Sequence, residues 1–158
     1  MAKTYEQFRQ NLLQSIPTVF NVGVMFSEMG YDVFIPAIKV IPKENMNHAE
    51  YQDDGDLHVT KDGKTTKINV KQSSRKFSSA DDWPFDTFFV SDKKAIDSSV
   101  EKNINIYITV SSDSKYAAIV NIKKTRHLWK ERTVYEKKYG IQTTVYEIDK
   151  NKVKFFKL

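Results

Sequence analysis

The strongest constraint on the fold is an alternating stretch, DDGDLHVTKDGKTTKINVKQ, at residues 53–72. Apolar and polar side chains alternate through DLHVT and again through TKINVKQ, which is the period of a β-strand with one buried face. Between these runs lies Lys61-Asp62-Gly63-Lys64, and an Asp-Gly pair is typical of a tight hairpin turn. The stretch therefore predicts two antiparallel strands joined by a short turn.

The same period assigns the side chains of the hairpin to two faces. The apolar face is predicted to hold Leu57, Val59, Ile68 and Val70. Asp56, Asn69 and Lys71 then fall together on the opposite face. Carboxylate and amide oxygens suit a hard cation such as Mg²⁺, and a neighbouring lysine can orient water or stabilise the transition state of phosphodiester hydrolysis. Spacing alone favours ordinary polar residues on the solvated side of a strand pair, where Asp and Lys are common.

The remaining sequence predicts helices first and strands afterwards. Thr4 and Gln7 form a capping-box pattern for a helix to about Gln14, and Pro17 is expected to break this helix and start another that ends at Gly30. Strands are expected in YDVFIPAIKVI, FDTFFVSD, INIYITVS and YAAIVNIK, a helix in RHLWKERTVYEKKYG, and a final hairpin in TTVYEID and KVKFFKL. This order predicts an α+β, mixed α/β protein built around one sheet.

The chain is long enough for one domain over residues 1–158. It has no cysteine, which excludes disulfides, thiolate zinc sites and a cysteine nucleophile. The N-terminal residues lack the apolar core of a signal peptide, and no run approaches 18 apolar residues. We therefore expect a cytoplasmic protein, in the host cytoplasm if the chain is of phage origin, with no membrane partner.

Charge is unevenly distributed along the chain. Residues 1–114 carry 13 basic and 16 acidic side chains, a net charge of −3, whereas residues 115–158 carry 12 and 4, a net charge of +8. A segment this basic suits a surface that faces phosphate groups. It equally suits a solvated face that keeps the protein soluble.

The hairpin and its neighbours resemble the PD-(D/E)XK nuclease superfamily, which includes restriction endonucleases and Holliday junction resolvases. Gly55-Asp56 matches the first motif element, and Asn69-Val70-Lys71 matches the acidic-X-Lys triplet. The preceding FSEMGYDVFIP is similar to the end of the family's first helix and the strand that follows, with Glu28 at the helix position. The resemblance covers about residues 18–120. It implies a restriction-endonuclease-like core, with a central mixed sheet flanked by helices, and a basic extension over about residues 121–158.

The resemblance also implies roles for these residues. Asp56 would be the principal ligand of Mg²⁺, with Mn²⁺ as a substitute, and Asn69 and the Val70 carbonyl would complete the protein ligands. Lys71 would position or activate the attacking water, and Glu28 would hold a metal-bound water or a second metal. The family usually has Glu or Asp where this chain has Asn69, and the missing carboxylate should weaken metal binding.

The implied activity is a Mg²⁺-dependent endodeoxyribonuclease that uses a metal-activated water, and the resemblance also allows a homodimer. The alternatives are a catalytically silent module that binds nucleic acid or a protein, and a site inactivated by an Asp-to-Asn change. Basic residues expected to contact DNA are Arg75, Lys76, Lys123, Lys124, Arg126 and Lys130. Phe77 and Trp83 are further candidates for stacking on bases, although Trp83 is expected mainly in packing.

Overall fold

The computed structural model describes residues 4–36, 42–45, 54–137 and 140–158. Its helices are α1 (Tyr5–Glu28), α2 (Lys93–Glu101) and α3 (Ile122–Thr125), with 3₁₀ turns η1 (Lys43–Asn45), η3 (Arg126–Leu128) and η4 (Lys150–Lys152). Its strands are β1 (Asp32–Phe34), β2 (Leu57–Lys61), β3 (Lys64–Gln72), β4 (Thr87–Asp92), β5 (Ile104–Val110), β6 (Tyr116–Asn121), β7 (Lys130–Glu136), β8 (Ile141–Asp149) and β9 (Lys154–Lys157). The predicted α+β class is confirmed.

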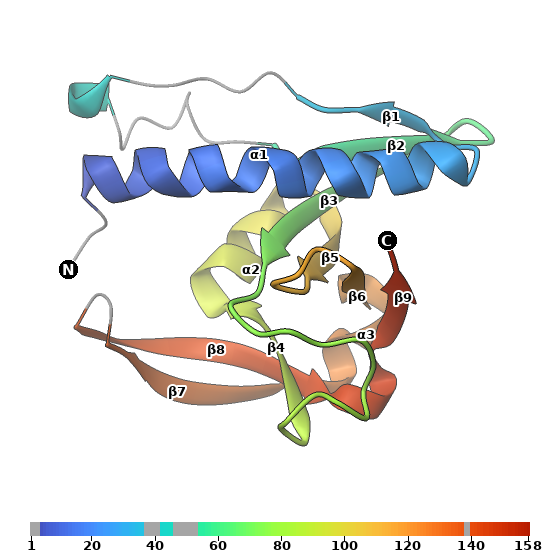
Figure 1. Ribbon diagram of the computed structural model, residues 1–158. Coiled ribbons are helices and arrows are strands. Elements are labelled where there is room, and N and C mark those ends of the chain that lie inside the picture. Colours follow the sequence, from blue (N-terminus) through green and yellow to red (C-terminus); the bar gives the residue numbers. More distant parts are fainter. Residues whose placement is uncertain (1–3, 37–41, 46–53, 138–139) are drawn as a thin grey trace.

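A six-stranded mixed sheet forms the centre of the molecule, with the strand order β1-β2-β3-β5-β6-β9 (Figure 1). β3 and β5 run parallel to each other, and the other neighbouring strands are antiparallel. The predicted hairpin is confirmed, since β2 and β3 pair antiparallel and are joined at Lys61↔Lys64. Asp62 and Gly63 have φ values of 52° and 73°, and two positive values are what a two-residue I′ turn requires.

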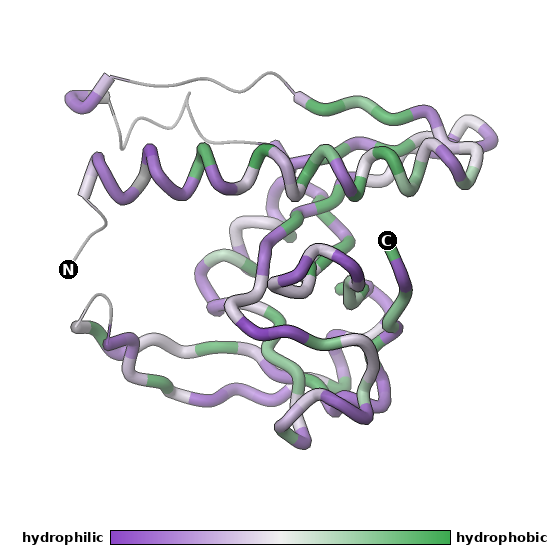
Figure 2. The backbone as a smooth tube through the Cα atoms, in the orientation of Figure 1, coloured by the Kyte–Doolittle hydropathy of each residue, from purple (hydrophilic) through white to green (hydrophobic). Residues whose placement is uncertain are grey.

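Helix α1 covers one face of this sheet and makes the first core. Val22, Phe26, Leu57 and Ile68 are buried there, so the apolar face that alternation assigned to the hairpin is confirmed. Figure 2 shows that hydrophilic residues predominate in the first turns of α1 and hydrophobic residues in its later turns. Burial of the apolar side of α1 at about 25 cal/mol per Å² is the main force that holds the helix on the sheet.

The expected break at Pro17 is wrong, because α1 continues without interruption from Tyr5 to Glu28. Pro17 and Leu13 both lie on the exposed side of the helix. Pro17 has no backbone N–H, so the Leu13 carbonyl lacks its usual hydrogen-bond donor. The carbonyl lies on the solvent-exposed side of the helix, which reduces the cost of the missing bond. The predicted start and end are confirmed: Thr4 and Gln7 form the capping box, and Gly30 follows the helix with φ 83°.

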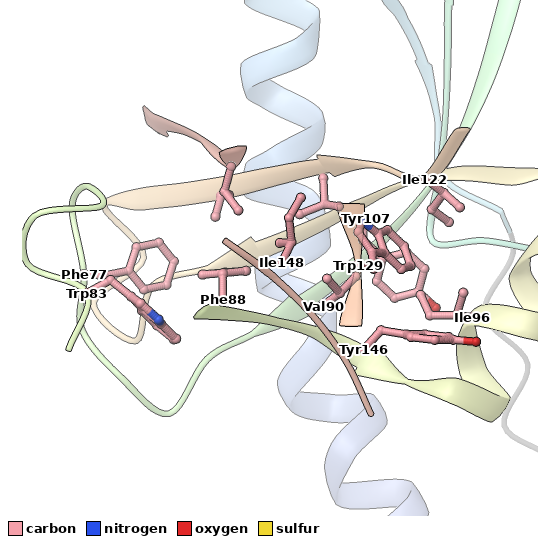
Figure 3. Close-up of a cluster of buried hydrophobic side chains, with 13 residues drawn as sticks. Phe77, Trp83, Phe88, Val90, Ile96, Tyr107, Ile122, Trp129, Tyr146 and Ile148 are labelled. Carbon is pink, nitrogen blue, oxygen red and sulfur yellow. The ribbon is translucent and has the colours of Figure 1, made fainter. Parts of the chain in front are cut away.

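The opposite face of the central sheet is covered by a second sheet and by α2. This three-stranded sheet has the order β4-β8-β7, so the expectation of one sheet is wrong. Its apolar side chains meet those of β5, β6 and α2 in a second core, part of which is shown in Figure 3. Phe88, Ile148 and Tyr146 come from the small sheet, Tyr107 from β5 and Ile96 from α2.

Two further predictions in the C-terminal third are wrong. TTVYEID and KVKFFKL do not pair with each other, because β8 joins β4 and β7 while β9 joins the edge of the central sheet beside β6. RHLWKERTVYEKKYG is mainly the strand β7 and not a helix. Its β-branched and aromatic run, Thr133-Val134-Tyr135, favours a strand once β8 offers a partner.

Residues 37–41 of YDVFIPAIKVI and residues 138–139 of RHLWKERTVYEKKYG lie outside the described residues. The strand expected in YDVFIPAIKVI is described as far as Pro36. β1 occupies Asp32–Phe34 of it at the edge of the sheet and ends before Pro36. Within the described part of the chain, no helix has the length and apolar character needed to span a membrane.

Candidate functional site

Asp56 is fixed against the backbone of β3 just before β2 begins. Gly55 has a φ of 93°, a conformation that favours glycine, and this turn directs the next residue onto the neighbouring strand. The Asp56 N–H donates to the Ile68 carbonyl at 2.9 Å, and its Oδ2 accepts the Val70 N–H at 2.7 Å. The N–H and C=O of one strand residue point to the same side, so the Val70 carbonyl lies on the edge that carries the Asp56 carboxylate.

Asn69 lies on the opposite face of β3 from Ile68 and Val70, among polar groups of the second core. Its Nδ2 donates to the Ser99 hydroxyl and to the Tyr107 hydroxyl, both at 3.1 Å. Ser99 gives its own proton to the Ala95 carbonyl at 2.7 Å, so towards Asn69 it acts as an acceptor. This chain of bonds fixes the orientation of the Asn69 amide.

Lys71 lies on the same face as Asn69 and reaches the strand β4. The β4–β8 register shifts between Phe89 and Ser91, and the bulge leaves the Val90 carbonyl to accept a hydrogen bond from the Lys71 ammonium. The Phe89 ring lies under the ammonium, 4.1 Å from Nζ to the ring centroid. Burial lowers the pKa of Lys71 from 10.5 to about 7, although the charge of Asp92 acts in the opposite direction.

Asp92 is an acidic neighbour of this cluster that the sequence reasoning missed. It is the last residue of β4 and the N-cap of α2, where its Oδ1 accepts the Ala95 N–H at 2.8 Å. Burial raises the pKa of Tyr107, and the charges of Asp92 and Asp56 raise it further. An N-cap aspartate before a short helix is readable in DKKAIDSSVE, and that helix was not predicted.

The predicted cluster is therefore not on a solvated face. Asn69 and Lys71 are half-buried, and their contacts Ser99 and Tyr107 are buried at 3% and 6% exposure. The interpretation of these side chains as ordinary surface polar residues is wrong, because the three-stranded sheet and α2 cover this side of β3. Polar groups in such a position must be hydrogen-bonded, and these are.

Glu28 is not brought to this cluster. It is exposed at the last residue of α1, and the carbonyl of the next residue, Met29, accepts a hydrogen bond from Lys61 at 3.2 Å. Lys61 is at the turn of the hairpin, whereas Asp56 lies at the opposite end of β2. Gln72, the last residue of β3, accepts a hydrogen bond from the Thr18 hydroxyl of α1 at 3.4 Å, on the other face of the sheet.

The predicted DNA-contacting residues occupy two separate regions. Arg75 and Lys76 are exposed in the loop after β3, where the Arg75 guanidinium lies over the Phe85 ring at 4.9 Å. The second group, expected on one helix, is instead distributed over α3, η3 and the start of β7: Lys123, Lys124, Arg126 and Lys130. All of these side chains are exposed. Phe77 and Trp83 are buried, so base stacking by them is excluded in this conformation.

The donor chemistry of the cluster suits one hard cation, because Asp56 offers a carboxylate, Asn69 an amide oxygen and Val70 a carbonyl. The set contains a single carboxylate, and among the described residues no group of three His, Cys, Asp or Glu could hold a metal. A ligand set with one carboxylate binds a hard cation weakly, so an ion held here would keep several of its waters.

Comparison with known proteins gives few likenesses. No protein-family model matches the chain. No curated protein matches it. Among solved structures, it is similar to Hjc, a Holliday junction resolvase from Archaeoglobus fulgidus, with a TM-score of 0.42, 8% sequence identity, and coverage of 84% of this chain and 85% of that one.

Proposed function

We propose that this chain is a metal-dependent endonuclease that hydrolyses DNA phosphodiester bonds with a metal-activated water. The observation that carries the proposal is the bond between the Asp56 carboxylate and the Val70 N–H. This bond holds a carboxylate oxygen of Asp56 beside the backbone of Val70, which lies between Asn69 and Lys71 on β3. The proposed ligands of a hard cation and a lysine therefore come from β3 and from the residue just before β2.

Each residue has a role that its environment supports. Asp56, Asn69 and the Val70 carbonyl would hold Mg²⁺, which supplies a Lewis acid and lowers the pKa of a bound water. Lys71 is balanced between its charged and neutral forms near neutral pH, because burial lowers its pKa to about 7. A group with a pKa near the working pH is well suited to transfer a proton to or from water.

A second candidate is a catalytically silent module that binds nucleic acid. It is favoured by Asn69, which replaces the second carboxylate expected in a nuclease and uses its amide protons to bond Ser99 and Tyr107. A neutral amide stabilises this polar network without a metal, so the site would persist as structure after the loss of catalysis.

Cleavage of supercoiled plasmid with Mg²⁺ or Mn²⁺ separates the two candidates. The unaltered chain, Lys71→Ala and Asn69→Asp are compared at equal concentration, with far-UV circular dichroism to check folding. Cleavage by the unaltered chain and none by Lys71→Ala supports the endonuclease. Cleavage by Asn69→Asp alone identifies an inactivated site. Failure of every version to cut, with all of them folded, overturns the enzyme proposal.

A further inference from the structure

A two-stranded arm extends from the small sheet. We define the β7–β8 arm as residues 133–137 and 140–144, where β7 and β8 pair only with each other, because β4 pairs with β8 from Val145 onwards. Figure 1 shows β7 and β8 projecting from the body on the same side as the N-terminal half of α1. None of these ten residues is buried. Both faces of the arm are therefore accessible to a partner, and contact with one would support a two-stranded hairpin that is only marginally stable by itself.

The register divides the arm into two chemically different faces. Thr133 pairs with Thr144 and Tyr135 with Gln142, and paired residues share a face. This inner face continues the row of Tyr146, which points into the second core. Its four side chains all carry a hydroxyl or an amide. The outer face carries Val134, Glu136, Ile141 and Thr143.

A row of hydroxyl and amide groups on a narrow ribbon fits a groove of duplex DNA. The major groove is about 12 Å wide and admits a two-stranded ribbon, and threonine and glutamine are among the side chains that hydrogen-bond base edges there. Tyr135 is 63% exposed, and a tyrosine hydroxyl also contacts phosphate. Lys137 is exposed on the arm directly after β7, whereas Lys130, at the start of β7, pairs with Glu147 in the row of the outer face.

The arm begins beside the candidate site. At its base, Val145 of β8 pairs with Asp92 of β4, and Lys93 forms an ion pair with Glu131 of β7 at 2.9 Å. Two residues before Asp92, the Val90 carbonyl of β4 accepts a hydrogen bond from the Lys71 ammonium. A duplex held along the arm would therefore pass the edge of the small sheet that leads to Lys71.

We propose that the β7–β8 arm enters the major groove of duplex DNA, with its inner face against the base edges and its base next to the hydrolytic site. This inference rests on the proposed function for the substrate class and adds the surface that holds the substrate. It assigns a role to a segment of the basic C-terminal third whose strand-paired shape was not predicted from the sequence.

The test measures binding without metal, so that cleavage is not involved. Fluorescence anisotropy follows a labelled duplex oligonucleotide in EDTA for the unaltered chain and for two double variants on adjacent cross-strand pairs. Tyr135→Ala with Gln142→Ala removes groups from the inner face, and Val134→Ala with Thr143→Ala is the matched control on the outer face. We expect the inner-face variant to lose about tenfold or more in duplex affinity, and the outer-face variant to lose less than about threefold.

Several outcomes would overturn the proposal that the arm binds duplex DNA. They are an unaltered chain that binds no duplex, equal losses in both variants, and tighter binding of a single strand than of the duplex. A dimer in light scattering that only the inner-face variant disrupts would make the arm a contact between copies of this chain, and would also overturn it. Failure of the hydrolase proposal would be seen separately. In that case the inner-face variant would still lose duplex affinity in EDTA, but no version of the chain would cut plasmid with Mg²⁺.

Discussion

The Asp56 carboxylate accepts the backbone N–H of Val70 at 2.7 Å, which ties the beginning of one strand to the centre of its neighbour. This contact uses a side chain where a β-ladder would normally use a carbonyl, so the carboxylate is held in a fixed position beside β3. In the proposed function, a carboxylate already held by the backbone would lose less entropy on binding the metal.

Asp56→Asn tests this contact. The amide oxygen can still accept the Val70 N–H, so we expect the variant to fold with a loss of less than about 2 kcal/mol in the free energy of unfolding. It lacks the negative charge of the ligand, and we expect at least about a hundredfold lower rate of plasmid cleavage with Mn²⁺. Urea unfolding and the cleavage rate are measured on the same preparation.

Asp54→Asn is the matched control, because Asp54 is an exposed aspartate two residues away that pairs with Lys67 at 2.7 Å. Removal of a surface ion pair costs at most about 1 kcal/mol, and cleavage should not change. Equal cleavage by the two variants would exclude Asp56 as a metal ligand.

Asn69→Asp adds a second carboxylate to the proposed ligand set. We expect Mn²⁺ to bind about tenfold or more tightly, because affinity for a hard cation follows the number of charged ligands. The metal-free variant should be less stable by about 1–3 kcal/mol, since a half-buried carboxylate replaces an amide that donates to Ser99 and Tyr107. Isothermal titration with Mn²⁺ and thermal unfolding with and without the ion measure both effects. Unchanged Mn²⁺ affinity would place the metal elsewhere.

The hairpin was predictable because the residues that determine it lie close together in the sequence. Alternation and an Asp-Gly turn fix the two faces and the register, and a shift by one residue would bury Asn69 and Lys71 beneath α1. What covers the second face was not predictable in this way. The contact of Lys71 with Val90 joins residues 19 positions apart, and it depends on a bulge in β4 that no short pattern reveals.

The first strand of the arm was predicted as part of a helix for a related reason. Residues 126–140 mix charged, aromatic and β-branched side chains without a clear period, and pairing with β8 decides the conformation of Lys130–Glu136 within this segment. Tertiary context overrides local propensity in such segments. The basic residues were identified correctly as exposed, but their arrangement on a strand and short turns changes which of them can act together.

Glu28→Gln tests whether Glu28 has the metal-site role that the family resemblance implies or only the exposed position that the structure gives it. The resemblance gives this residue a role at the metal, whereas the structure places it at the exposed end of α1 beside Met29 and Lys61. From the geometry we expect less than about a twofold change in cleavage rate, and a change of less than about 0.5 kcal/mol in the free energy of unfolding. A large loss of cleavage with unchanged folding would show that α1 contributes to the site.

Lys71→Met tests the buried amine through the pH dependence of stability. The pKa of Lys71 is lowered from 10.5 to about 7 by burial, so the unfolded chain binds one more proton than the folded chain between these values. The free energy of unfolding of the unaltered chain should therefore rise with pH above 7, by at most about 1.4 kcal/mol per pH unit from this group. Below pH 7 both states are protonated and the cost of burying the charge is complete, so Lys71→Met should be more stable there by about 2–4 kcal/mol.

Urea unfolding from pH 6 to 9 should show this advantage shrinking as pH rises, whereas Lys64→Met, at the exposed hairpin turn, should follow the unaltered chain. A constant difference between Lys71→Met and the unaltered chain over this range would show that the lysine stays charged in the folded protein, and that it cannot accept a proton from water near neutral pH.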